Sequence, residues 1–380
     1  MMSLKQKILR NLSSVPGASI DRKIVVIESD DWGSLRMPSK EVYAFLDNNK
    51  LDVSSGDSKR YNENDTLESA EDLNALYDVL TSVKDAKGNY PIFSPITIVA
   101  NPDFEKIKAN HFEHYYYEPF NATLNRYNRT QAFALWKEGI DNKLFLPEFH
   151  GREHLNVATW MRALQNKDAE THLAFDKEVW GYTNKNKFNV MYQAAFDLEF
   201  KEDLQVQKEV ITSGLDLFES LFGYKARYFV PPNGNINNAL EQVASEKGID
   251  YIFAAKIQKE ALGQGNVKNR FYWLGKKNAF GQMYTTRNCF FEPSQEGKDW
   301  LNTCLSDIEI AFRWKKPAVI STHRVNFIGG LRPENRTKGL AAFKQLLDTI
   351  VKKWPDVEFM SSAAVADSIA GKNRGTAKQL

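Results

Sequence analysis

Short apolar runs alternate with segments of helical spacing along most of the chain. A continuous run of Ile, Val and other β-favouring residues predicts a strand that is buried on both faces, as in a parallel sheet covered by helices. Apolar residues that recur every three or four positions predict amphipathic helices. The strands are predicted at 23–33, 92–100, 143–149, 226–230, 251–254, 271–291 (as one or two strands), 318–322 and 357–360. The helices are predicted at 38–49, 67–83, 203–222, 237–247, 298–314 and 339–352.

This alternation predicts an α/β fold, a distorted (β/α)7-8 TIM-like barrel with long loop insertions. We expect residues 1–22 to form an N-terminal segment and residues 23–370 to form a single barrel domain. The insertions are expected near 50–90, 101–140 and 165–190, where few apolar runs occur. Two separate domains are the alternative, because the first 140 residues carry few strands for their length.

Composition and charge narrow the class of protein. A chain of 380 residues, 42% of them hydrophobic, can bury a large core. The net charge of +2 gives no reason to expect nucleic acid or an anionic membrane as the partner. Cys289 and Cys304 are the two cysteines, too few for a disulfide framework. No apolar stretch has the length of a signal peptide or a membrane span, so we expect a cytoplasmic protein.

Two adjacent acids, Asp30 and Asp31, end the first apolar run. In parallel α/β folds, catalytic groups collect at the carboxyl ends of the strands. Adjacent carboxylates repel each other unless a cation or a shared proton relieves them, so the pair points to a metal or to acid/base chemistry. The alternative is that either acid simply caps the following helix.

Three histidines also follow predicted strands. His150 comes directly after the run at 143–149, and His154 lies four residues further on. Two imidazoles and one carboxylate make a ligand set that leaves positions open on Zn²⁺ or Fe²⁺. His323 ends the run at 318–322. A solvated helix face explains a His-x-x-x-His pattern equally well, and a lone histidine is more often structural, so the hypothesis depends on all of these residues meeting at one edge of the sheet.

Four short motifs, in this order, resemble the polysaccharide deacetylase family, the NodB-like carbohydrate esterases with a distorted βα barrel. Residues 28–33, Glu-Ser-Asp-Asp-Trp-Gly, are similar to the family's Thr-Phe-Asp-Asp-Gly, and His150 with His154 to its His-x-x-x-His. Residues 230–234, Val-Pro-Pro-Asn-Gly, resemble Arg-Pro-Pro-Tyr-Gly, and residues 321–323 its Leu-x-His. The third motif lacks its Arg, for which Arg227 or Arg287 is the candidate substitute. The family's Asp-Trp motif, which orients the catalytic histidine, has no clear counterpart.

The resemblance implies a role for each matching residue. Asp31, His150 and His154 would hold a divalent metal, Zn²⁺ first and Fe²⁺, Co²⁺ or Mn²⁺ as alternatives. Asp30 would be the general base and His323 the general acid. The implied reaction is removal of an acetyl group from a carbohydrate, with a carbohydrate substrate as the partner and the oligomeric state left open.

A second group of residues is expected to bind substrate or the oxyanion. The turn at Pro232, Asn233 and Gly234 could present a main-chain N–H to the oxyanion, and Arg287 lies in a Thr-Thr-Arg-Asn stretch near the expected place. Trp32 could stack on a sugar ring, or simply pack beneath the loop. Two other functions remain open: hydrolysis of another C–N bond or a glycosidic bond on the same barrel, and saccharide binding without turnover.

Overall fold

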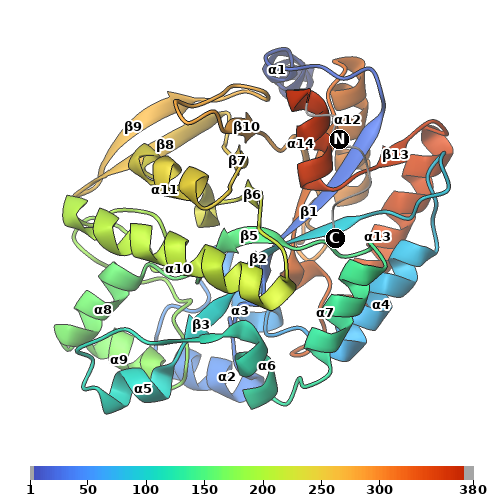
Figure 1. Cartoon of the computed structure of the whole chain (residues 1–380). Coiled ribbons are helices and arrows are strands. Elements are labelled where there is room, and N and C mark those ends of the chain that lie inside the picture. The colour runs from blue at the N-terminus through green and yellow to red at the C-terminus, as the bar shows by residue number, and fades with distance from the viewer. Residues whose placement is uncertain (1–3, 372–380) are drawn as a thin grey trace.

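A curved sheet of nine strands forms the centre of the computed structural model, which describes residues 4–371 (Figure 1). The strands follow the order β10-β7-β6-β5-β2-β1-β12-β11, with β13 pairing with β1 outside this path, and all pairs are parallel. The strands are β1 (Ile24–Trp32), β2 (Phe93–Ile98), β5 (Glu148–Gly151), β6 (Tyr228–Phe229), β7 (Tyr251–Phe253), β10 (Met283–Thr285), β11 (Cys289–Phe290), β12 (Ala318–His323) and β13 (Glu358–Phe359).

The sheet curls so that its two ends meet in one stretch of chain. Apart from β13, strands that neighbour each other in the sheet are consecutive in the central sheet's chain order, except that its first strand, β1, pairs with its last, β12, as in a βα barrel. The two end strands, β10 and β11, are separated by only residues 286–288. The chain therefore pairs with β7 through β10 and then, a few residues later, with β12 through β11. The prediction of an α/β fold with a distorted barrel is therefore confirmed.

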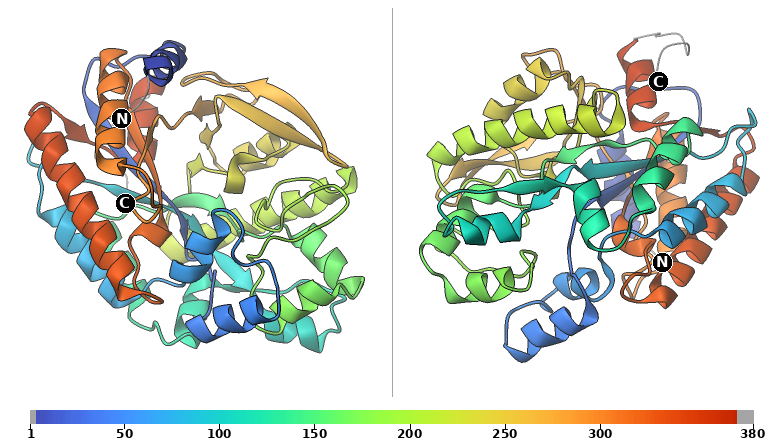
Figure 2. Two further views of the ribbon diagram at one scale, coloured as in Figure 1. Left: turned by 180° about the vertical axis from the view of Figure 1, so that it is seen from behind. Right: turned by 60° about the horizontal axis from the view of Figure 1, so that its bottom comes forward.

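Helices cover the outside of the sheet, and α4, α7 and α13 lie side by side on one flank (Figure 2). A capping box between Ser69 and Asp72 begins α4, and Gly223, with φ of 79°, ends α10. The helices are α1 (Leu4–Ser14), α2 (Lys40–Asn48), α3 (Ser58–Asn64), α4 (Ala70–Thr81), α5 (Phe104–Ala109), α6 (Phe120–Arg126), α7 (Ala132–Asp141), α8 (Val157–Gln165), α9 (Ala169–Phe175), α10 (Leu204–Phe222), α11 (Glu241–Glu246), α12 (Trp300–Arg313), α13 (Pro333–Lys353) and α14 (Ser362–Ala370).

Smaller elements occupy the loops. Two antiparallel pairs join β3 (Ala100–Pro102) to β4 (Tyr117–Pro119), and β8 (Ile257–Gly263) to β9 (Asn266–Phe271). The single 3-10 turns are η1 (Lys201–Asp203), η2 (Pro232–Gly234), η3 (Asn238–Leu240) and η4 (Arg324–Asn326). Within residues 4–371 no helix combines the length and the apolar character needed to cross a membrane.

Several predicted boundaries are wrong, and two of them have a local cause. The strand predicted at 143–149 begins only at Glu148, because Pro147 has no N–H and interrupts the pairing that Phe145 starts with Phe93. The helix predicted at 339–352 begins six residues earlier, at Pro333, a residue that suits the first helical position. The division into an N-terminal segment at 1–22 and one domain at 23–370 stays a prediction.

Candidate active site

A local irregularity in β1 turns both acids toward one cleft. Consecutive residues of a regular strand point to opposite faces of the sheet. The pairing of β1 with β2 shifts register between Ser29 and Trp32, and Asp31 has a φ of 77°. This break in the alternation lets Asp30 and Asp31 line the same cleft. On the other side of β1, Asp30 pairs in register with His323 of β12.

Asp31, His150 and His154 come together as the sequence predicts. The Oδ1 atom of Asp31 lies 3.1 Å from Nε2 of His154 and 3.6 Å from Nε2 of His150. One potential ligand atom from each residue falls within 4.8 Å of the other two. His150 comes from the end of β5, and His154 from the loop that follows it.

The surroundings of the two histidines suit a divalent cation. Nδ1 of His150 lies 2.6 Å from the main-chain oxygen of Val230, which fixes this nitrogen as the donor and leaves the lone pair on Nε2. That Nε2 atom is buried and has no hydrogen-bond partner. Burial lowers the pKa of His154, which favours the neutral ring that a metal requires. Two imidazoles and a carboxylate therefore fit Zn²⁺ or a similar ion.

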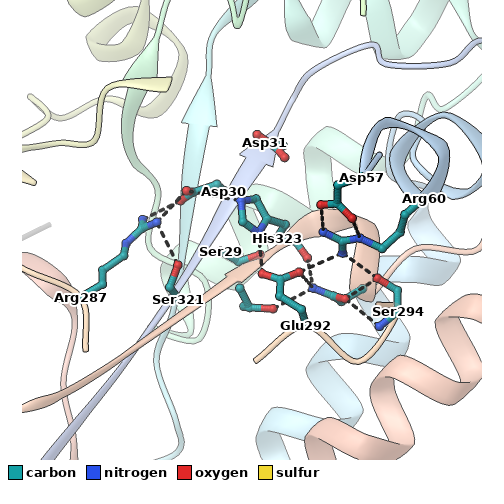
Figure 3. Close-up of polar contacts among 12 residues, drawn as sticks. Ser29, Asp30, Asp31, Asp57, Arg60, Arg287, Glu292, Ser294, Ser321 and His323 are labelled. Atoms are coloured by element: carbon teal, nitrogen blue, oxygen red, sulfur yellow. Dashed lines mark hydrogen bonds and ion pairs between the residues drawn. The ribbon is translucent and has the colours of Figure 1, made fainter. Parts of the chain in front are cut away.

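Arg287 holds Asp30 in place (Figure 3). Its two terminal nitrogens donate to the two carboxylate oxygens of Asp30, each at 2.6 Å, and its Nε donates to Glu28 at 2.7 Å. Burial alone would raise the pKa of Asp30, but the Arg287 guanidinium outweighs it and lowers that pKa. Arg287 thus contacts the expected base, whereas Arg227, the other candidate substitute, pairs with Asp367 and Asp250.

Glu292 holds His323, a contact that the sequence did not predict. Nδ1 of His323 lies 2.5 Å from Oε1 of Glu292 (Figure 3). The second oxygen of Glu292 accepts from Arg60 and from Asn326, both at 2.9 Å. Burial works to lower the pKa of His323, yet the Glu292 carboxylate prevails and raises it to about 9. The one signal in the sequence is that Glu292 directly follows the strand predicted at 271–291, much as Asp30 follows the first apolar run.

Nε2 of His323 faces Asp30. It lies 3.9 Å from Oδ2 of Asp30, a gap in which a reacting group can approach both side chains. The cleft around them has a volume of about 570 Å³. Two expected insertions contribute to its walls, because Asp57 and Tyr61 come from the insertion near 50–90 and Trp180 from the one near 165–190.

Trp32 does not line the cleft. It is fully buried, its indole N–H donates to Ser29 Oγ at 2.9 Å, and its ring packs against Phe93, Trp136 and Phe145. The expectation that Trp32 stacks on a sugar is therefore wrong. The alternative, that it packs beneath the loop, is what the structure shows.

The turn η2 is only partly placed for binding. Asn233 and Gly234 line the cleft, but Pro232 is buried and is not part of its wall. The N–H of Gly234 donates to the main-chain oxygen of Pro231 at 3.0 Å, so it is not free for an oxyanion. Within this turn, the roles expected of Pro232 and of the Gly234 N–H are corrected, and a substrate contact of Asn233 stays a prediction.

Comparison with known proteins gives structural likenesses at low identity. No protein-family model matches the chain, and no curated protein matches it. A protein of Mycobacterium smegmatis assigned as a polysaccharide deacetylase is similar at 10% identity, with 96% of this chain and 99% of that chain covered and a TM-score of 0.45. A 4-alpha-glucanotransferase from Thermococcus litoralis is similar at 11% identity, over 92% of this chain and 40% of that chain, with a TM-score of 0.46.

A third solved structure is the Xyl-CE4 domain of a multidomain xylanase from the hindgut metagenome of Trinervitermes trinervoides. It has 10% identity, 92% of each chain is covered, and the TM-score is 0.37. The solved structures that this chain resembles over most of its length thus include one assigned as a polysaccharide deacetylase and one named as a CE4 domain.

Proposed function

We propose that this protein is a metal-dependent hydrolase that removes acetyl groups from a carbohydrate. The observation that carries the proposal is the meeting of Asp31, His150 and His154 in one cleft with Asp30 and His323. The motif resemblance supplies the substrate class. A divalent cation held by the three ligands, Zn²⁺ first, supplies Lewis acidity toward a carbonyl oxygen and makes a water molecule more acidic.

Asp30 is proposed as the general base. Its lowered pKa keeps the carboxylate ionised at neutral pH, so it can accept a proton from the attacking water. Two hydrogen bonds from Arg287 fix the orientation of the carboxylate. A carboxylate has about four acceptor sites, so Asp30 keeps room for the incoming proton.

His323 is proposed as the general acid. Because Nδ1 faces Glu292, Nε2 is the atom that points toward Asp30 and the substrate. With a pKa of about 9, the imidazole carries its proton at neutral pH and can give it to the departing amine or alcohol. Asp30 and His323 thus supply the base and the acid from adjacent strands.

The proposal is tested by metal analysis together with acetate release. We expect the purified protein to contain a divalent metal and to release acetate from acetylated oligosaccharides. Asp31→Ala and His150→Ala should each lose the metal and lower kcat/KM by more than about 100-fold, because even the outer partners of metal ligands cost 10- to 100-fold. His114→Ala, at an exposed histidine outside the cleft, is the matched control and should behave as the wild type.

Retained metal and retained turnover in Asp31→Ala would reject the assignment of the ligands. Metal without acetate release from any acetylated sugar, together with cleavage of another amide, would favour the alternative C–N hydrolase. Bound sugar without any product would favour the non-catalytic saccharide-binding barrel.

A further inference from the structure

Arg36 is a buried arginine in the wall of the cleft that forms no ion pair within the described part of the chain. Its side chain is only 7% exposed, and it lines the same cleft as Asp31 and His154. Its Nε donates to Oδ1 of Asn62 at 3.0 Å. Among the residues that the structure describes, no carboxylate forms an ion pair with Arg36, and its two terminal nitrogens make no hydrogen bond.

The other arginines around the cleft are satisfied. Each of them ion-pairs with two carboxylates: Arg60 with Asp57 and Glu292, Arg287 with Glu28 and Asp30, and Arg324 with Asp65 and Glu68. Burying a charge without an ion-pair partner is costly, so an arginine that lacks a carboxylate among arginines that have one indicates a ligand. Arg36 is also the only arginine or lysine in the described wall of the cleft.

The guanidinium group of Arg36 is held in position before any ligand arrives. The rings of Tyr61 and Trp180 lie 5.5 and 5.6 Å from its central carbon. Gly181 packs so closely that a Cβ atom there would lie 2.8 Å from Nε of Arg36. Two inserted segments therefore converge on this one side chain and fix its orientation.

The same two rings connect Arg36 to both halves of the catalytic site. Tyr61 makes an edge contact with His323, with ring centroids 5.7 Å apart. Trp180 stacks on His154 at 5.9 Å. A group bound at Arg36 would therefore lie one aromatic ring away from the proposed acid and one ring away from a proposed metal ligand, within reach of the same substrate molecule.

We propose that Arg36 binds a carboxylate carried by the substrate, so that the preferred substrate is an acidic saccharide, a chain that contains a sugar acid. Two free terminal nitrogens in one plane match the two oxygens of a carboxylate. This inference rests on the proposed function, because it treats the bound saccharide as the substrate. The binding itself does not require turnover. The competing explanation is that Arg36 only offsets, at a distance, the negative charge of the cleft acids.

The test compares two probes that differ in one group. The first is an oligosaccharide of alternating glucuronic acid and N-acetylglucosamine, and the second is its carboxyl-reduced form, in which each carboxylate becomes CH₂OH. Binding to the full-length, metal-loaded protein is measured by calorimetry. We expect the wild type to bind the acidic probe roughly 10- to 100-fold more tightly, the range for losing a charge-assisted hydrogen-bonded pair.

Arg36→Gln should remove this preference, and Arg36→Lys should keep part of it, because the charge remains but the two-pronged geometry is lost. Arg313→Gln, at an exposed arginine of α12, is the matched control and should retain the full preference. Metal content and a melting curve for each variant show whether the site has survived the substitution.

Equal binding of the two probes by the wild type, or binding of neither, overturns the inference. So does an equal loss for both probes in Arg36→Gln with the metal retained, since a purely structural arginine would produce it. The proposed hydrolase can fail separately: Arg36-dependent binding without acetate release would contradict the enzyme and leave the carboxylate site standing. Acetate release at equal rates from neutral and acidic acetylated oligosaccharides, without Arg36 dependence, would contradict the carboxylate site and leave the hydrolase standing.

Discussion

Asp30 and His323 lie opposite each other on neighbouring strands, and a partner of opposite charge holds each in one protonation state. Arg287 favours the ionised form of Asp30, and Glu292 favours the protonated form of His323. A base that is ionised and an acid that is protonated coexist over the whole neutral range under these conditions. The chemistry proposed for the site therefore depends on two residues, Arg287 and Glu292, that do not react themselves.

Glu292→Gln should move the alkaline limb of the pH profile of kcat/KM to lower pH. His323 acts in its protonated form, which is lost as pH rises through its pKa of about 9. Without the negative charge, that pKa should fall toward the ordinary histidine value of about 6.5. The measurement is acetate release as a function of pH. Glu296→Gln, at an exposed position in the same loop, is the control and should leave the limb near pH 9.

An alkaline limb that does not move in Glu292→Gln would show that His323 does not titrate as the acid. A loss of activity at every pH with an unchanged profile would point to a structural role for Glu292.

Single residues were predictable where the chemistry is local to a strand end. Asp30, Asp31, His150 and His323 each follow an apolar run, so the sequence places them at one edge of the sheet. Glu292 contacts His323 across 31 positions, and Arg36 contacts the ring of Trp180, which comes from a distant segment of the chain. Such contacts depend on how the loops pack, which no local pattern encodes.

At the scale of the element, β1 combines a regular strand with one break. The strand is fully buried from Ile24 to Asp30, and its apolar run predicts this burial as far as Ile27. The positive φ at Asp31 is a conformation that an Asp tolerates better than most residues. Gly33 follows with φ of 83°, and a Cβ atom there would lie 2.5 Å from the main-chain oxygen of Ile98. The strand end therefore has a shape that few sequences permit.

Glycine and alanine substitutions should rank in opposite order of stability at Asp31 and at Asp30. At Asp31, alanine incurs the left-handed strain of about 1–2 kcal/mol, whereas glycine does not. At Asp30, where φ is negative, glycine loses about 0.5–1 kcal/mol relative to alanine through backbone entropy. We therefore expect Asp31→Gly to be more stable than Asp31→Ala, and Asp30→Ala to be more stable than Asp30→Gly.

The measurement is urea unfolding of the four variants in metal-free buffer, so that loss of a ligand does not enter the comparison. The pair at Asp30 is the control for the pair at Asp31. The same ranking at both positions would show that the backbone of Asp31 is not strained.

Elements with strong patterns were predictable, and one with an inverted pattern was not. The spacing at 203–222 and 298–314 corresponds closely to α10 and α12. The β8–β9 hairpin was missed, because its inner and outer positions are reversed. Gln258 and Glu260 are buried while Ile257 is 64% exposed, and Glu260 is satisfied by Arg270. Tertiary contacts decided this element rather than its own periodicity.

At the scale of the whole molecule, the cleft is formed by segments that lie far apart in the sequence. The proposed metal ligands span residues 31 to 154 and come from the ends of β1 and β5, which are separated in the sheet by β2. The barrel order of the strands brings their carboxyl ends together, so the sequence could anticipate the ligand set. It could not anticipate the wall, because the inserted segments that supply Tyr61 and Trp180 carry no barrel pattern.

Removal of the metal should lower the melting temperature of the whole chain. An ion that binds only the folded state stabilises it by about 2.7 kcal/mol when its free concentration is 100 times Kd. For a chain larger than 250 residues this corresponds to a shift of several degrees. The comparison is between the metal-loaded protein and the protein treated with a chelator, followed by thermal denaturation.

His154→Ala should melt at the same temperature with and without the chelator, while His114→Ala, at an exposed histidine, should keep the difference of the wild type. Because the ligands come from two non-adjacent strands, the cation would link β1 to β5 across β2. We therefore expect the loss of stability to be global. The melting transition reported by the fluorescence of core tryptophans, such as Trp32 and Trp136, should shift together with the transition of the secondary structure. Equal melting temperatures with and without the chelator in the wild type would show that the three side chains do not hold an ion.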